Sequence, residues 1–249
     1  MFKDIMVNRV GITTNSYMKT VKILKTIKPN INYKILLKNL VEIEELKSHT
    51  HINPFNKLNI IEPRYIEIEC DWILANTENN TPNVANILGN FGKLITNSNI
   101  NIPINIASYD NVKFYNATLF NLYDLIKFEC EEDLPLTEMI IGDEYVKNYI
   151  EDEKLGGGQY LEYHNNPHFH SPISSNNSGY YILGKKEDNK IKLSAFTIPF
   201  HKAIYTPGNI IHSDANLVGN WLVVYSKTNM YSSVLLRDKE NKLTKIKFV

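Results

Sequence analysis

The sequence predicts a mainly β fold with a mixed α/β segment at its N-terminal end. From about residue 100 onward, short runs rich in Ile, Val, Tyr and Phe follow one another, separated by Gly, Pro, Asn and Asp. Hydrophobic residues make up 43% of the 249 residues and charged residues 22%, a composition able to bury a core. Short strands at this density are typical of an antiparallel sandwich or barrel.

The first hundred residues carry mixed signals. Residues 39–47 have apolar side chains at nearly helical spacing with acidic residues between them, and we expect a helix there. Residues 65–74 begin by alternating apolar and polar side chains, which indicates a strand. Residues 1–100 are therefore expected to form a mixed α/β extension. This extension is expected either to add strands to the sheets of a β-barrel domain at residues 101–249 or to cover one end of that domain.

The rest of the chain is expected to form consecutive strands. Three glycines at 156–158 indicate a flexible linker or an edge bulge, and Glu187-Asp188-Asn189 predicts a tight hairpin. His201 is expected at a surface turn. We expect strands at 101–108, 111–120, 125–131, 159–164, 179–186, 190–198, 202–207, 220–226, 232–238 and 243–249.

Composition gives no reason to expect a nucleic-acid or membrane partner. Lys plus Arg number 27, as do Asp plus Glu, so no charge excess favours nucleic acid or an anionic membrane. No long apolar run suggests a membrane span, and the N-terminus does not resemble a secretory leader. The two cysteines, Cys70 and Cys130, have no CxxC spacing, which fits reduced thiols in a cytoplasmic protein.

Histidines are concentrated in two short segments. His168 and His170 lie two apart, so they share a face if the segment PHFH is extended. Glu162 and His164 have the same parity, although Asn-Asn-Pro at 165–167 is expected to bend the chain between the pairs. His212 follows the turn sequence Pro-Gly-Asn at 207–209. Imidazoles gathered in this way suit a divalent metal ion and leave coordination positions open.

These segments resemble the two motifs of the cupin superfamily. His168-Phe169-His170 and Gly184 match the ends of the first motif, and Asn177 stands near the place of its usual metal-binding glutamate. Pro207, His212 and Asn216 match the second motif, with Asn209 in place of a glycine. The resemblance covers roughly residues 155–230 and implies a cupin jelly roll, the double-stranded β-helix.

The resemblance implies a mononuclear metal site made by His168, His170 and His212. Cupins commonly use three histidines and one glutamate, but no Glu lies between His170 and Glu187. Glu162, His164 or Asn177 are alternatives for a fourth ligand. Iron is the first choice of metal, and zinc, nickel or manganese are alternatives.

The implied function is a metal-dependent enzyme acting on a small polar or anionic molecule. The resemblance makes a dioxygenase the first expected class, followed by an isomerase, epimerase or lyase. Glu162 and His164 are the candidates for proton transfer. The alternative is a non-catalytic cupin that binds a small, sugar-type ligand. Because cupins often associate through sheet edges, a homodimer is expected. Asp214 forms an H-x-D pair with His212, but no later histidine completes the triad of 2-oxoglutarate oxygenases.

Overall fold

The computed structural model describes residues 6–37, 41–46, 59–75, 91–225, 228 and 230–249. Strands make up most of these residues, as the sequence predicts, and no helix among them is long and apolar enough to cross a membrane. The elements are β1 (Asn8–Val10), β2 (Tyr17–Ile27), β3 (Asn32–Leu37), β4 (Val41–Leu46), β5 (Ile66–Glu69), β6 (Asp71–Ile73), β7 (Gly92–Thr96), β8 (Asn99–Ile102), β9 (Ile104–Ile106), α1 (Tyr109–Val112), the 3-10 turn η3 (Lys113–Tyr115), β10 (Thr118–Asn121), β11 (Leu125–Lys127), β12 (Leu134–Ile141), the π-helical turn η4 (Val146–Ile150), β13 (Tyr160–His164), β14 (His168–Pro172), β15 (Ser178–Glu187), β16 (Lys190–Thr197), β17 (Lys202–Thr206), β18 (Ile211–Val224), β19 (Tyr231–Asp238) and β20 (Lys245–Phe248).

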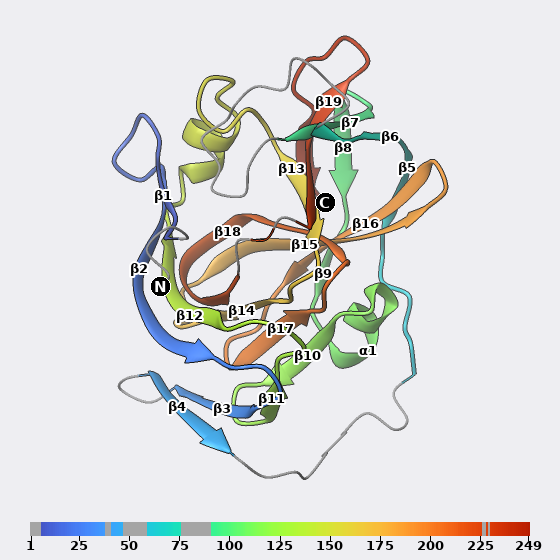
Figure 1. The fold of residues 1–249 in the computed structure, drawn as a ribbon. Coiled ribbons are helices and arrows are strands. Elements are labelled where there is room, and N and C mark those ends of the chain that lie inside the picture. The colour runs from blue at the N-terminus through green and yellow to red at the C-terminus, as the bar shows by residue number, and fades with distance from the viewer. Residues whose placement is uncertain (1–5, 38–40, 47–58, 76–90, 226–227, 229) are drawn as a thin grey trace.

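The long strand β18 organises the main sheet. Its first half pairs with β13 and β15, and its second half pairs with β12 and β14. Gly219 stands between the two halves at a φ of 102°, a backbone conformation that a residue with a Cβ rarely adopts. In Figure 1, β14, β15, β17 and β18 occupy the middle of the molecule while β2 and β12 curve along one side. The first half of β18 thereby carries His212 and Asp214 into the interior.

Several strands from the first hundred residues belong to the same large sheet, while β3 and β4 form a separate sheet with β11, and β8 pairs with β20. β2 pairs with β12, β5 with β16, and β7 with β19, so early strands add to a sheet built mostly from later ones. The regular elements named within residues 6–37, 41–46, 59–75 and 91–102 are strands, and the mixed α/β extension expected at residues 1–100 stays a prediction. The boundary at residue 100 stays a prediction, and no cupin-specific strand order is established.

Two segments differ from the sequence prediction in type. The segment 39–47, where a helix was expected, contains strand β4 at 41–46, and residues 39, 40 and 47 lie outside the described residues. In β4, half-buried Val41 and Ile43 alternate with exposed glutamates and pack against a buried cluster that includes residues of β3. The strand expected at 111–120 begins instead as α1 and η3. Ser108 caps α1, because its hydroxyl accepts from the Asn111 amide and the Asn111 side chain accepts from the Ser108 amide.

Other predicted elements are confirmed. The hairpin between β15 and β16 turns at Asp188, which has a φ of 53°, with Glu187 paired to Lys190. The strand expected at 65–74 is present as β5 and β6, interrupted at Cys70. His201 is exposed at a turn, as expected. The glycines at 156–158 are buried, and the guanidinium of Arg237 donates to the carbonyl of Gly157. Their amides donate to the carbonyls of Tyr149, Asp152 and Ile150.

Candidate metal centre

Three strands carry the chemically active side chains into the interior. Glu162 and His164 lie on β13, His168 and His170 on β14, and His212 and Asp214 on β18. Each pair is spaced i, i+2, so both members point to the same face of their strand. All six side chains are buried, with exposed fractions of Glu162 3%, His164 2%, His168 3%, His170 1%, His212 1% and Asp214 8%.

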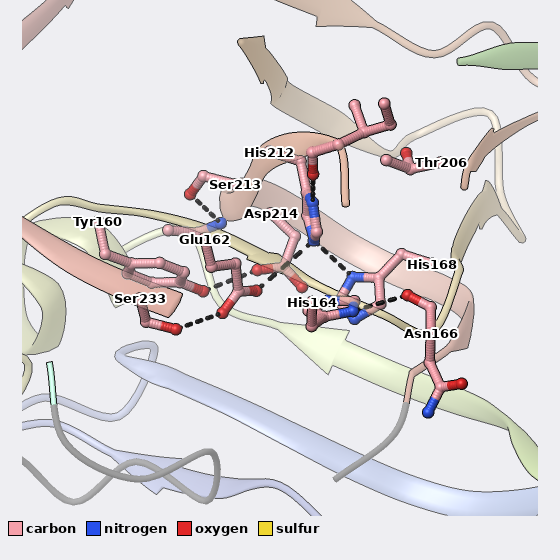
Figure 2. Close-up of polar contacts among 12 residues, drawn as sticks. Tyr160, Glu162, His164, Asn166, His168, Thr206, His212, Ser213, Asp214 and Ser233 are labelled. Carbon is pink, nitrogen blue, oxygen red and sulfur yellow. Dashed lines mark hydrogen bonds and ion pairs between the residues drawn. The ribbon is translucent and has the colours of Figure 1, made fainter. Parts of the chain in front are cut away.

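Four of these residues form a compact group of metal-ligand atoms. Glu162, His164, His168 and His212 each offer one such atom, and the four atoms lie within 4.8 Å of one another. The Nε2 atom of His212 is 3.0 Å from Nδ1 of His168 and 3.7 Å from Oε1 of Glu162 (Figure 2). Two ligand atoms that share one ion, each about 2.1 Å from it, lie roughly 3 to 4 Å apart. These separations therefore suit one divalent ion.

Backbone carbonyls fix the orientation of two of the imidazoles. Nδ1 of His164 lies 2.6 Å from the carbonyl oxygen of Asn166, and Nδ1 of His212 lies 2.8 Å from that of Ile210. Because a carbonyl only accepts, each Nδ1 carries the proton and each Nε2 is left with a lone pair. The Nε2 atom of His164 is buried and has no hydrogen-bond partner among the described residues. This arrangement prepares a neutral imidazole to bind a metal through Nε2.

Burial keeps these histidines neutral. Burial first, and then the charge of neighbouring imidazoles, lower the pKa of His212 to about 3 and that of His168 well below the usual value. Burial also lowers the pKa of His164. The Glu162 carboxyl shifts the other way, because burial and then the charge of Asp214 raise its pKa to about 8. Without a cation, Glu162 is therefore mostly protonated at neutral pH.

Two tight turns hold the strands that carry His164 and His212. Asn209 adopts a left-handed φ of 66°, and its amide donates to the carbonyl of His164 over 2.6 Å. A Cβ on Gly208 would come within 2.1 Å of the carbonyl oxygen of Asn165, so only glycine fits this approach. The turn sequence Pro-Gly-Asn thus links the β17–β18 connection to the β13–β14 connection and fixes the distance between their histidines.

A second group adjoins the first. His168, His170 and Asp214 also offer ligand atoms within 4.8 Å of one another. Nε2 of His170 lies 3.3 Å from Oδ2 of Asp214, whose Oδ1 accepts a 2.7 Å hydrogen bond from the hydroxyl of Tyr160. Burial alone would raise the pKa of Asp214, but His170 and Tyr160 outweigh it and hold that pKa below the usual range.

The sequence-predicted residues distribute over both groups. His168 and His212 lie together with Glu162 and His164, which were expected to transfer protons, whereas His170 lies in the second group. That His168, His170 and His212 share one ion stays a prediction. The amide of Asn177 contacts the backbone of Asn220 with both its oxygen and its nitrogen.

Sequence reasoning gave Asp214 little weight. The available signal was its parity with His212 on one strand, the same signal that paired His168 with His170.

Comparisons with known proteins give no further assignment. The chain matches no protein-family model, no curated protein and no solved structure. The geometry therefore establishes a mainly β protein with a buried His/Glu cluster that could hold a metal ion.

Proposed function

We propose that the protein is a metal-dependent enzyme in which Glu162, His164, His168 and His212 hold one divalent ion. The observation that carries this proposal is the convergence of four buried ligand atoms within 4.8 Å. Two of the imidazoles are already fixed with Nε2 lone pairs facing inward. Lone pairs gathered in a dry interior are unfavourable to one another unless a cation lies between them. The missing cupin glutamate is then supplied by Glu162 from β13.

Three nitrogen ligands and one carboxylate suit several first-row metals. Iron is the first choice, with zinc, nickel and manganese as alternatives, because imidazole and carboxylate suit all of them. When bound, such an ion polarises a carbonyl or carboxylate of a small molecule, or supports oxygen chemistry if it is iron. The resemblance of the segments 167–170 and 207–216 to cupin motifs supports a jelly roll and makes dioxygenase activity the first class to test, before isomerase, epimerase and lyase activity.

The protein's own residues hold and orient the ligands. Asn166 and Ile210 fix two imidazole tautomers through their carbonyls, and Ser233 donates to Oε2 of Glu162 over 3.3 Å. We assign Glu162 and His164 to the ligand set, in place of the proton-transfer roles that their sequence positions suggested. A cytoplasmic location, a small polar or anionic substrate and a homodimer complete the proposal. Sedimentation or light scattering tests the homodimer.

A second candidate function follows from the burial of the cluster. All four ligand residues are at most 3% exposed, and four protein ligands in a closed site are typical of structural ions. In this alternative the protein is a non-catalytic module whose ion stabilises the barrel. Its small-ligand site would lie elsewhere.

Elemental analysis of untagged protein tests the proposal. We expect at least one equivalent of a divalent metal in the wild type and a loss of about one equivalent in His212→Ala and in His164→Ala. His201→Asn is the matched control, because His201 is exposed and asparagine tolerates its left-handed φ of 65°. Absence of metal from every protein, even after reconstitution, rejects the metal-dependent function.

Activity assays separate the two candidates. The iron-loaded protein is tested for oxygen consumption with small thiols, phenols and acids, and the zinc- and manganese-loaded proteins for isomerisation of small sugars and acids. Turnover that is lost with His212→Ala supports the enzyme. A protein that unfolds on chelation and turns over none of these compounds supports the structural ion.

A further inference from the structure

The six buried donors come in pairs from three strands. Each strand contributes two of them at i, i+2, on one face. The side chains of such a pair can converge, since Glu162 and His164 of β13 both offer ligand atoms to the first group. Six donors are nevertheless more than the four ligands that one tetrahedral ion takes.

The ligand atoms fall into two overlapping groups. Glu162, His164 and His212 belong to the first group, and His170 and Asp214 belong to the second. His168 is the member common to both. Its ring centre lies 4.3 Å from that of His164 and 4.5 Å from that of His212, against 5.5 Å from that of His170.

Both nitrogens of His168 are buried, and one has no hydrogen-bond partner. Nδ1 faces Nε2 of His212 at 3.0 Å, while Nε2 of His168 has no partner in the described part of the chain. If Nδ1 carries the proton, the Nε2 lone pair is buried without a partner. If Nε2 carries it, two lone pairs face each other between His168 and His212. Either tautomer leaves a buried polar group unsatisfied, which is unfavourable.

The second group has the separation and charge of a cation site. Nε2 of His170 and Oδ2 of Asp214 are 3.3 Å apart, a spacing that two ligands of one ion adopt. The Tyr160 hydroxyl donates to the other carboxylate oxygen and so orients Asp214 towards His170. A hydrogen-bonded carboxylate behind or beside a histidine is also the common support of a metal ligand.

We propose that His168, His170 and Asp214 bind a second divalent cation beside the first, which makes the centre dinuclear. The inference rests on the proposed function, because His168 serves both ions, one with each ring nitrogen, and gives up its N–H proton to solvent. Two divalent cations against the carboxylates of Glu162 and Asp214 and the imidazolate of His168 leave the centre with one net positive charge. Anionic substrates, such as small carboxylates or phosphates, are then the favoured class.

Metal stoichiometry tests the inference on the full chain. The protein is stripped with a chelator, titrated with Zn²⁺ in the presence of a micromolar-affinity chelator, desalted and analysed for zinc. We expect two equivalents in the wild type and in the His201→Asn control. We expect one equivalent in Asp214→Asn and in His170→Gln, which keep the first group intact. Thermal melts establish that each variant is folded.

The outcomes are distinct. One equivalent in the wild type overturns the second ion and leaves the proposed function standing. Loss of all zinc in Asp214→Asn and His170→Gln also overturns it, because one ion would then use both groups. Absence of zinc from the wild type overturns both proposals together. If Asp214→Asn does not fold, the wild-type stoichiometry and His170→Gln still decide the matter.

Discussion

Replacing Glu162 by glutamine should stabilise the metal-free protein increasingly as the pH rises. The pKa of Glu162 is 4.5 in an exposed setting and about 8 in the fold, where burial and then Asp214 disfavour its ionised form. The folded state therefore keeps a proton that the unfolded chain has lost. The stability that Glu162 contributes through this proton is fully present below pH 4.5 and is lost as the pH rises through 8.

The magnitude follows from the shift. A pKa of Glu162 raised from 4.5 to about 8 lowers the free energy of unfolding, relative to acid pH, by about 5 kcal/mol well above pH 8 and by about 3 kcal/mol at pH 7. Glutamine does not ionise, so the variant avoids this loss. Between pH 5 and pH 7, the stability of Glu162→Gln relative to the wild type should rise by about 2 to 3 kcal/mol.

Urea unfolding of chelator-treated protein at pH 5, 6, 7 and 8 measures the difference. Groups distant from Glu162 titrate equally in both proteins, and its neighbour Asp214 has a pKa below the usual range and stays ionised from pH 5 to pH 8, so the difference isolates Glu162. Glu44→Gln, on an exposed position of β4, is the control and should show no such trend. A difference between wild type and Glu162→Gln that stays constant with pH would refute the reasoning. Added metal should reverse the order, because only the carboxylate is an anionic ligand.

Three further predictions follow from the same contacts. Metal binding at pH 7 should release roughly nine-tenths of a proton from Glu162, because a group with a pKa of about 8 is protonated to that extent there. Calorimetry in two buffers of different ionisation enthalpy measures the number of protons released, which should be much smaller at pH 9. Gly208→Ala should lower the free energy of unfolding, measured in urea, by about 2 kcal/mol or more, because the added Cβ would meet the Asn165 carbonyl at 2.1 Å. It should also weaken metal binding, since the turn holds the backbone of His164. Tyr160→Phe, which removes a 2.7 Å hydrogen bond to buried Asp214, should cost about 1.5 to 3 kcal/mol at pH 7, and an unchanged unfolding midpoint would contradict the assigned role of that bond.

Local sequence patterns predicted which side chains share a face, and long-range pairing decided which of them meet. Strand parity placed His168 with His170 and Glu162 with His164 correctly on their strands. The register that sets Glu162 opposite His212 joins residues fifty positions apart, and no local pattern encodes it. The same limit explains residues 41–46, where six residues fit a helical or an alternating pattern and pairing with β3 selects the strand.

Without a bound ion, the cluster lowers the free energy of unfolding at every pH of interest. Below pH 6.5 the histidines oppose folding, because the folded pKa of His212, about 3, lies under its unfolded value and stability is lost as the pH falls between them. Above pH 4.5 Glu162 opposes folding in the other direction. The two ranges overlap, so no pH relieves both groups.

A divalent cation relieves both groups at once, since it prefers neutral imidazoles and an ionised carboxylate. Its binding energy is then also folding energy, and a closed structural site would serve that purpose with the first group alone. The second group, with Asp214 held by Tyr160 against His170, goes beyond that need. Its presence is the structural reason to favour chemistry at this centre over stabilisation only.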